Sequence, residues 1–398
     1  MAGEEEWELW LNRQRGRGRG SEMDPDGESH SSLYRLRVGG GGGGGVEEGG
    51  GGDGDGDLTS VCFDGDALLF RSYVMSRASE WSLKDEHFLK EVDVSGCRIW
   101  DGGAKVLSED LVGSVGTLED IDLSDDGIGD LGMGVLMPLL AQCSRLERLD
   151  LSGNCFSDAE GDMVRSLMRL PSLTSLNLSR NPSFFGMWAL EPSSTLRELS
   201  LCGQEGGQAL VENESAVLLS SQIHGNNSLE DLDLECNDIG DSGATALSGL
   251  LLPGRASRLR RLGLRNNLVG TPGAINIARA LSHNASLVDI DLRKNAIGGE
   301  GIREVLCSVS SNTTIESILL GENVRRGHNN CSVPSEAQWP LGVSKCLSSC
   351  ASLVILDLSF CGVTHAQVLQ LIPYVTSDPL PPLRVLHLAG EITRHMIK

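Results

Sequence analysis

The feature that most constrains this chain is an apolar spacing that recurs over most of its 398 residues. The pattern Leu-x-x-Leu-x-Leu-x-x-Asn, with Ile replacing Leu in places, starts at Leu146, Leu173, Leu229, Leu259, Leu287 and Ile315. Looser copies start at Leu89, Leu118, Leu196, Leu353 and Leu383. Several successive starts lie 27 to 30 residues apart. A fixed period of this length predicts a repeat architecture from about residue 89 onward, because each period is one supersecondary unit.

One copy, LEDLDLECNDIGDSGATALSGLLL at residues 229–252, contains two different periodicities. Its first half alternates apolar and polar residues with period 2, which predicts a short β-strand. After the asparagine the apolar spacing changes to 3 and 4, which predicts an α-helix. Related copies place Gly132, Gly243, Gly273 and Gly301 at one offset, where a small residue lets the start of the helix approach the strand.

Asparagine follows six of the predicted strands, where the chain must turn out of the sheet. A buried amide at such a turn can bond backbone groups that have lost their ladder partners. Because one strand and one helix cannot bury their apolar faces alone, the copies must stack. Stacking predicts a structural asparagine ladder of Asn154, Asn181, Asn237, Asn267, Asn295 and Asn323. The weaker copies carry Cys97, Asp126, Gln204, Cys361 and Glu391 at this position.

These repeats resemble those of leucine-rich repeat proteins. The 28-residue period and the Asn-x-Ile-Gly-Asp-x-Gly-Ala sequence are similar to the ribonuclease-inhibitor-like subclass. The resemblance implies an α/β solenoid of about 11 repeats, a curved horseshoe with a parallel β-sheet on its concave face and helices on its convex face. Members of the subclass are mostly protein-binding scaffolds. They include ribonuclease inhibitors, sensing domains of innate-immune receptors and GTPase-activating proteins for the GTPase Ran.

Composition divides the chain into three parts. Residues 1–57 are rich in glycine and acidic residues, and they cannot bury enough apolar surface to offset the entropy of ordering. We therefore expect a disordered N-terminal arm. Aromatic residues and leucines return at residues 58–88, which we expect to form an N-terminal cap on the stack. Residues 89–398 form the leucine-rich repeat domain, with an insertion near residues 324–340.

The formal net charge of −22 favours a basic partner and makes nucleic-acid or anionic-membrane binding unfavourable. No apolar stretch is long enough to span a membrane, and the N-terminus has no apolar signal core. The eleven cysteines are scattered, which indicates reduced thiols rather than a disulfide framework. These observations predict a cytoplasmic protein, with the nucleus as the other compartment compatible with them.

Residues between the strand leucines are predicted to point to the concave face. Carboxylates stacked on neighbouring strands about 4.8 Å apart would hold a negative potential suited to a basic protein surface. Alternatively, aspartate is simply common at these repeat positions and the carboxylates are solvated. The candidate partner-binding residues are Asp93, Asp120, Asp122, Arg148, Asp150, Asp231, Asp233, Arg261, Arg265, Asp289, Asp291 and Asp357.

One repeat departs from this acidic pattern, since it carries Arg255, Arg258, Arg260, Arg261 and Arg265. The aspartates of the neighbouring repeats predict that these arginines form neutralising ion pairs. Alternatively, the arginine cluster is a binding hot spot, because arginine is favoured at such sites.

The sequence contains no phosphate-binding loop, no Gly-x-Ser-x-Gly elbow and no His-Glu-x-x-His motif. One constellation has zinc-like spacing, His328-x-x-Cys331 followed by Cys346-x-x-x-Cys350. The repeat argues against this site, because Cys350 occupies the same offset before its leucine as Cys143. We therefore expect core cysteines, no metal, no cofactor and no enzymatic activity.

The favoured function is a non-enzymatic scaffold that binds a protein partner through its concave face. One alternative is a regulator of a small GTPase, similar to the Ran-directed family, although such proteins normally carry an acidic C-terminal tail and this chain ends basic. Another is an RNA-associated protein that acts through the arginine–glycine tract Arg15–Gly20. The chain ends just after a predicted strand, so the exposed edge of the last repeat is a further surface open to pairing.

Overall fold

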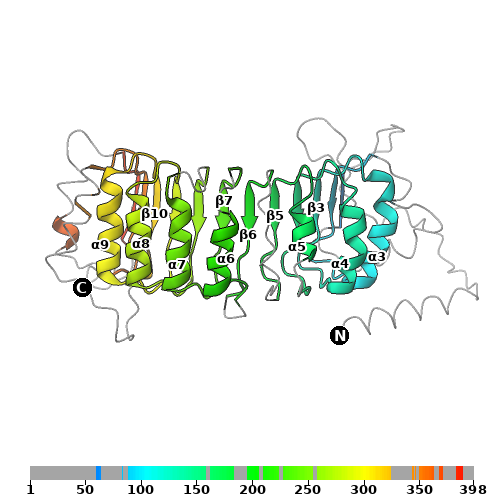
Figure 1. The fold of residues 1–398 in the computed structure, drawn as a ribbon, viewed down its shortest axis with the longest axis horizontal. Helices are drawn as coiled ribbons and strands as arrows, with labels where there is room; N and C mark the ends of the chain where they lie inside the picture. The colour runs from blue at the N-terminus through cyan, green and yellow to red at the C-terminus, as the bar shows by residue number, and fades with distance from the viewer. Residues whose placement is uncertain are drawn as a thin grey trace, which may run out of the picture. The chain divides into compact units, whose positions relative to one another are not determined.

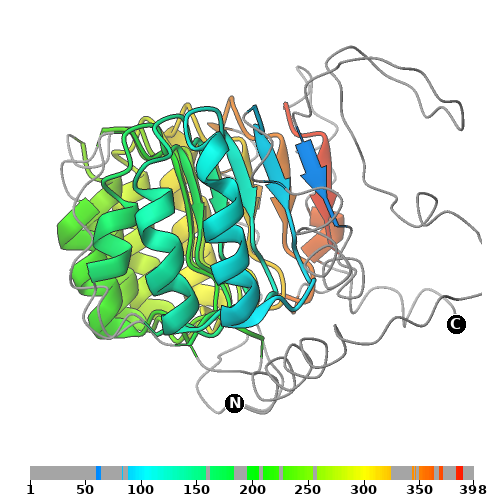
Figure 2. The same ribbon diagram turned by 90° about the vertical axis from the view of Figure 1, so that its right-hand side faces the viewer.

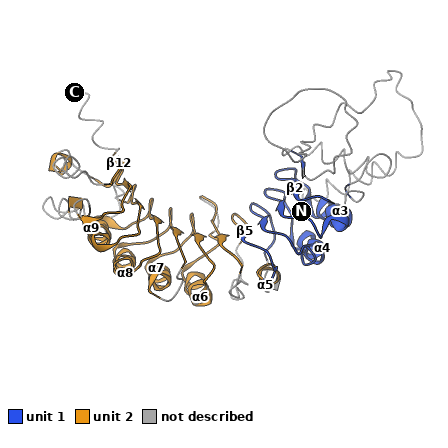
Figure 3. Cartoon of the chain, turned by 90° about the horizontal axis from the view of Figure 1, so that it is seen from above, with its two compact units in different colours: residues 1–158, 169–177 blue, residues 159–168, 178–398 orange. Residues whose placement is uncertain are grey.

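The computed structural model describes most of the repeat region. The described residues are 60–63, 83, 88–157, 162–182, 195–205, 209–223, 227–253, 258–323, 343–344, 346, 349–362, 367–370 and 382–388. The expected disordered arm, most of the expected cap, the insertion near 324–340 and the end of the chain lie outside them. The chain divides into two compact units (Figure 3). Unit 1 contains Met1–Asp158 and Arg169–Asn177, and unit 2 contains Ala159–Met168 and Leu178–Lys398.

Unit 1 alternates parallel strands with helices. Its described strands pair in chain order and are β1 (Ser60–Cys62), β2 (Glu91–Asp93), β3 (Asp120–Asp122), β4 (Arg148–Asp150) and β5 (Ser175–Asn177). Its described helices are α3 (Trp100–Asp110), the 3-10 helix η3 (Leu111–Ser114) and α4 (Asp130–Leu140). Figure 2 shows α3 and α4, in cyan and teal, on one side of the strands. Strand β1 lies in the segment expected only as a cap, and the repeat pattern did not predict it.

Unit 2 repeats the same arrangement. Its described strands also pair in chain order and are β6 (Glu198–Ser200), β7 (Asp231–Asp233), β8 (Arg261–Gly263), β9 (Asp289–Asp291), β10 (Ser317–Leu319), β11 (Ile355–Asp357) and β12 (Val385–His387). Its described helices are α5 (Asp162–Leu167), α6 (Asn213–Ile223), α7 (Asp241–Ser248) with η5 (Gly249–Leu251), α8 (Thr271–Leu281) and α9 (Gly298–Ser308) with η6 (Val309–Ser311). Helices α6 to α9 lie side by side on one side of the strands (Figure 1). This alternation confirms the predicted α/β leucine-rich repeat solenoid.

The core is a stack of leucines and isoleucines contributed at fixed positions by each repeat. In the repeat of β7, Leu229, Leu232, Leu234, Ile239 and Leu247 are each at most 2% exposed. Full burial of one such side chain contributes roughly 1.5–3 kcal/mol relative to leaving it in water. Because these side chains pack against the repeats on both sides, each repeat depends on its neighbours for stability.

The recurring glycines make room for a side chain of the preceding repeat. Asp241, the first residue of α7, accepts hydrogen bonds through Oδ1 from the backbone N–H groups of Gly270 and Gly273, at 2.9 and 2.8 Å. A Cβ atom at Gly273 would lie 2.8 Å from that oxygen. Asp101 and Asn213 cap the next helix start in the same way. The approach of helix to strand is therefore only part of the reason for glycine, since a cap from the neighbouring repeat also needs the space.

Candidate functional site

In strands β2 to β11 the first and third residues flank a buried middle residue and lie on the face of the sheet opposite the helices. Because the strands are parallel and in register, equivalent residues form rows. In unit 1 the third residues Asp93, Asp122 and Asp150 are direct neighbours on β2, β3 and β4. Adjacent strands lie about 4.8 Å apart. The row therefore places three carboxylates side by side, and we call it the unit 1 acidic row.

None of the three carboxylates of the unit 1 acidic row forms an ion pair with a described residue. Each accepts the backbone N–H two positions further along the chain, at 2.8 to 2.9 Å. Asp93 also accepts the thiol of Cys62 at 3.1 Å, and Asp150 also accepts Nδ2 of Asn177 at 2.8 Å. These partners are all neutral, so the negative charge of the row is not compensated by them.

The central residue of the row, Asp122, has a pKa raised above its ordinary value, mainly because it is partly buried. The backbone and hydroxyl of Ser124 oppose the shift, whereas the charges of Asp150 and Asp93 increase it. A cation placed against this row would therefore be attracted by charges that repel one another.

The row of first residues is different, because it contains an internal ion pair. Nε of Arg148 on β4 donates to Oδ2 of Asp120 on β3 at 2.7 Å. This hydrogen bond raises the pKa of Arg148. The two side chains are 54% and 32% exposed, so the pair contributes at most about 1 kcal/mol. It nevertheless neutralises Asp120, while Glu91 on β2 remains exposed.

In unit 2 two of the outward-facing carboxylates, Asp231 and Asp291, are paired with arginines. Nη1 of Arg261 on β8 lies 3.3 Å from Oδ2 of Asp231 on β7. Burial raises the pKa of Asp231, and the charge of Arg261 opposes that shift. The third-residue row is also interrupted, because Gly263 lies between Asp233 and Asp291. A Cβ atom at Gly263 would be 2.6 Å from Oδ1 of Asp233, so this carboxylate occupies the space that a side chain would fill.

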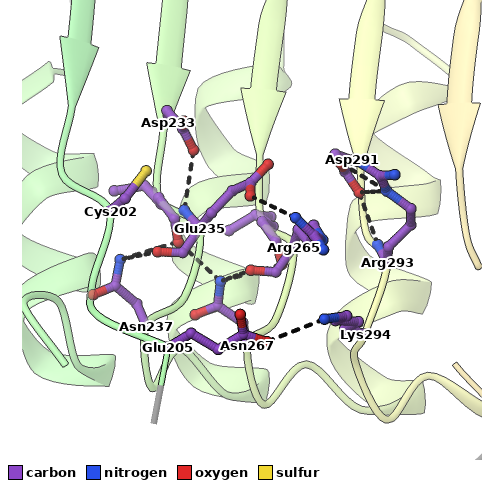
Figure 4. A network of polar contacts seen from close by, with 12 residues as sticks. Cys202, Glu205, Asp233, Glu235, Asn237, Arg265, Asn267, Asp291, Arg293 and Lys294 are labelled. Carbon is purple, nitrogen blue, oxygen red and sulfur yellow. Dashed lines mark hydrogen bonds and ion pairs between the residues drawn. The ribbon is translucent and has the colours of Figure 1, made fainter. Parts of the chain in front are cut away.

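Ion pairs continue past the carboxyl ends of these strands, in the turns shown in Figure 4. Nη1 of Arg265 lies 3.7 Å from Oε2 of Glu235, so Arg265 pairs with the preceding repeat as Arg261 does. Nε of Arg293 donates to both carboxylate oxygens of Asp291 at 3.0 Å. Arg261 and Arg265 thus show the neutralisation expected for the arginine cluster, and Arg293, in the next repeat, adds a pair of the same kind. Arg255 lies outside the described residues.

One pair in Figure 4 was missed by the sequence reasoning. Nζ of Lys294, in the turn after β9, donates to Oε1 of Glu205, in the turn after β6, at 3.1 Å. The two residues are 89 positions apart. The only signal is that the repeat starting at Leu196 is longer than its neighbours, which gives its turn enough residues to reach another repeat.

Two further groups of this network, Glu235 and Cys202, have raised pKa values. Burial raises the pKa of Glu235, and the charges of Asp233 and Asp291 add to the shift, while Arg265 opposes it. Burial also raises the pKa of the Cys202 thiol to about 12. The Cys202 thiol is therefore protonated at neutral pH and is a poor nucleophile.

The structure places Asp357 differently from the other strand-face aspartates. Its side chain is only 5% exposed, and Oδ1 accepts the backbone N–H of Ser359 at 2.9 Å. A Cβ atom at Gly321 would lie 3.0 Å from the Asp357 carboxylate, so glycine in the preceding repeat lets the carboxylate pack against that turn. Asp357 was expected on an open binding face and instead lies buried. Asp289 on β9 remains half-buried with no ion pair among the described residues.

The asparagines after the strands hold neighbouring repeats together. Nδ2 of Asn237 donates to the carbonyl of Leu234 in its own repeat and to that of Leu201 in the preceding repeat, at 3.0 and 2.9 Å. Oδ1 accepts the backbone N–H groups of Leu210 and Val211 at 2.9 and 2.8 Å. Equivalent bonds to the preceding repeat are made by Asn154, Asn267, Asn295 and Asn323. Asn181 donates to the carbonyl of Leu178 at 3.0 Å. These buried amides are structural.

The described residues give no support for a zinc site at the motif His328-x-x-Cys331 and Cys346-x-x-x-Cys350. His328 and Cys331 lie outside the described residues. Cys346 and Cys350 are buried, and burial raises the pKa of the Cys346 thiol well above its ordinary value. Sγ of Cys350 lies 3.8 Å from the carbonyl of Asn312, the residue at the same position of the preceding repeat. Among the described residues, no group of three or more His, Cys, Asp or Glu side chains is arranged to hold a metal ion.

Length and polarity rule out a membrane-spanning role for every helix in the described part of the chain.

Comparison with known proteins shows what the chain resembles. A family model described as Leucine Rich repeat matches residues 86–108, 142–159, 225–248 and 283–306. Ribonuclease inhibitor from Sus scrofa is 29% identical over 260 residues, which cover 50% of this chain and 56% of the relative. NACHT, LRR and PYD domains-containing protein 12 from Mus musculus is 33% identical over 214 residues, which cover 51% of this chain and 19% of the relative. The chain therefore spans about half or less of the length of these relatives.

A solved structure of an internalin from Listeria monocytogenes is also similar. It aligns with a TM-score of 0.44 and 16% sequence identity, over 81% of this chain and 88% of the internalin.

Proposed function

This chain is a leucine-rich repeat protein of the ribonuclease-inhibitor-like type, and on that premise we propose that it is a non-enzymatic scaffold that binds a basic protein partner. Fold alone does not define a function, so the proposal depends on a particular surface. That surface is the unit 1 acidic row, Asp93, Asp122 and Asp150, together with the exposed Glu91. The observation that carries the proposal is that this row of carboxylates has no ion pair among the described residues.

The name of one relative supports a protein as the partner of this chain. The porcine relative is named for inhibiting a ribonuclease, which is itself a protein. A short strand row also suits a protein surface, because it offers several charges at a fixed spacing rather than an enclosed pocket. The pairing of complementary charges accelerates association and selects the partner more than it increases affinity.

A basic partner follows from the charges of unit 1. Partial burial raises the pKa of Asp122, and repulsion from Asp150 and Asp93 adds to the shift, so a cation that approaches the row is attracted by more than one carboxylate. The net charge of −22 extends this attraction beyond contact distance at low ionic strength. Binding should therefore weaken as salt concentration increases.

Unit 2 offers a matched surface on which two of three equivalent carboxylates are already paired, while the third, Asp233, accepts the backbone N–H of Glu235. Asp231 pairs with Arg261, and Asp291 pairs with Arg293. We therefore assign the basic partner to unit 1 and use the unit 2 residues as the control.

The test is affinity capture from cell extract with three full-length baits. These are the wild type, the triple variant Asp93→Asn/Asp122→Asn/Asp150→Asn and the control Asp231→Asn/Asp233→Asn/Asp291→Asn. Asparagine keeps the oxygen that accepts the backbone N–H, so all three baits should fold. We expect a basic protein that both the wild type and the unit 2 variant retain, and that the unit 1 variant binds about tenfold or more weakly. Equal capture by all three baits would refute the proposal.

A further inference from the structure

A second polar surface lies on unit 2, where the chain enters strands β8, β9 and β10. It is a pocket of about 530 Å³. Arg258 and Arg260, from the repeat of β8, line one part of it. Val288 comes from the next repeat, and Thr314 and Glu316 come from the repeat after that. Because β8, β9 and β10 are neighbours in that order, Val288 lies between the arginines and Glu316.

Both arginines of this pocket are exposed. Neither guanidinium forms an ion pair or a hydrogen bond with a residue that the structure describes, although the protein is strongly acidic. Glu230, which also lines the pocket, already pairs with Arg197 at 3.2 Å. This contrasts with Arg261 and Arg265 of the same repeat, which are both paired.

The repeat explains why Arg260 is left without a partner. Arg260 is the residue just before its strand. At this position of the repeat, two pairs of neighbouring repeats carry opposite charges that form an ion pair. Lys90 pairs with Glu119 at 3.0 Å, and Arg197 pairs with Glu230. After Arg260 the same position is Val288, which has no charge. The next carboxylate in the row, Glu316, is two strands away, which is about 10 Å.

We propose that this pocket binds a peptide segment of a partner protein that carries an acidic side chain. Two guanidinium groups offer several donors to one carboxylate or phosphate group, and such charge-assisted bonds are short and strong. Val288 contacts the aliphatic part of the segment. Glu316 repels a second acidic group and favours a basic residue about 10 Å from the first. In the polyproline II conformation, residues three positions apart lie on the same face of the chain and about 9 Å from each other. The segment therefore binds in this conformation, with an acidic and a basic residue three positions apart.

This surface differs from the unit 1 acidic row in charge, position and ligand. The two sites therefore bind different partner segments, and failure of one proposal leaves the other standing.

The experiment uses the full chain and the fluorescein-labelled peptide Gly-Glu-Ala-Ala-Lys-Gly, with binding followed by fluorescence anisotropy at low salt. The test variant is Arg258→Gln/Arg260→Gln. The matched control is Arg145→Gln, because Arg145 immediately precedes its repeat-opening leucine just as Arg258 does and is also exposed. We expect the double variant to bind about tenfold or more weakly and Arg145→Gln to bind like the wild type. Circular dichroism checks that each variant is folded.

Two further peptides identify the source of the negative charge. A peptide with Gln in place of Glu should not bind. A peptide with phosphoserine in place of Glu should lose affinity in the same double variant, and if it binds the wild type more tightly, the natural segment is phosphorylated. Equal binding by the double variant, equal loss in Arg145→Gln, or no binding of either anionic peptide at about 1 mM would overturn the proposal.

Discussion

The two units share one repeat but differ in how regularly an asparagine follows the strand. In unit 2 this position is Asn237, Asn267, Asn295 and Asn323 in four successive repeats, and each is at most 6% exposed. In unit 1 the corresponding residues of β2, β3 and β4 are Cys97, Asp126 and Asn154. The backbone geometry is retained in both units, so the comparison shows how the repeat tolerates a residue that lacks the amide.

Asp126 is the most informative difference. Its carboxylate is fully buried, and neither oxygen forms a well-directed hydrogen bond among the described residues. Burial raises the pKa of Asp126 to about 8, although the backbone N–H groups of Ile99 and Arg98 oppose the shift. In the next repeat Nδ2 of Asn154 donates to a backbone carbonyl of each of two repeats. An ionised carboxylate has no donor, so Asp126 fits this position best when it is protonated.

The two units also differ in whether the carboxylates on their strand faces are paired with arginines. Unit 1 leaves Asp93, Asp122 and Asp150 without ion pairs, whereas unit 2 pairs Asp231 and Asp291 with arginines. The comparison therefore separates two roles for charge in one repeat. At the buried turn a charge conflicts with the backbone, whereas on the strand face it is available to a partner.

Truncation of the core should have the largest effect and should be similar in both units. Leu232 on β7 and Ile121 on β3 occupy the same repeat position and are at most 1% exposed. We expect Leu232→Ala and Ile121→Ala each to lower the free energy of unfolding by roughly 2–5 kcal/mol, because each leaves a cavity. Urea denaturation measures both. A loss below about 1 kcal/mol in either variant would mean that its repeat is not packed as described.

The asparagine ladder should give the next largest effect. Asn237→Ala removes an amide that bonds five backbone groups in two repeats. We expect a loss of about 1–3 kcal/mol, because those buried groups lose their partners. Asn237→Asp sharpens the comparison, since it places the residue of unit 1 at the unit 2 position. It should be less stable than the wild type at neutral pH and should recover stability as the pH is lowered towards the pKa of the new carboxyl group.

The position of the ladder was predictable from the sequence, and so was the solenoid. Both follow from a spacing that recurs many times, so an error in one copy does not change the fold. The pairing of Arg261 with Asp231 also followed, because parallel register places equivalent residues side by side. Strand β1 did not follow, since Ser60–Cys62 does not open a full copy of the pattern.

Contacts that depend on loop length or on one neighbouring residue could not be predicted. The Glu205–Lys294 pair requires the extra length of one turn, which has no periodic signal. The burial of Asp357 depends on Gly321 in the preceding repeat. The caps formed by Asp101 and Asp241 had a visible signal in the recurring Asp-x-Gly sequence, but periodicity alone does not show that the aspartate reaches the next repeat.

Replacing Asp126 with asparagine should stabilise unit 1. The folded-state pKa of about 8 exceeds the ordinary value of 3.8, so the unfolded chain binds fewer protons between these values. Stability of the wild type therefore decreases as the pH rises through this window. Asp126→Asn removes this titration and restores the amide, so its advantage should grow from about pH 4 and level off above about pH 8. It should reach roughly 2–4 kcal/mol at neutral pH, because each pKa unit corresponds to about 1.4 kcal/mol. Urea denaturation of both proteins across this range measures the difference, and a constant difference would contradict the assignment.

The smallest effects should come from the strand face, and their signs should differ between the units. Asp122→Asn removes a carboxylate that is repelled by Asp93 and Asp150, so it should stabilise the fold by a few tenths of a kcal/mol. Asp291→Asn removes the partner of Arg293 and should destabilise by about 0.5–1 kcal/mol. Both effects are electrostatic and the side chains are partly exposed, so high salt should reduce each effect. Denaturation at low and high salt tests the pair, and equal signs in the two variants would show that the strand faces of the two units are not electrostatically different.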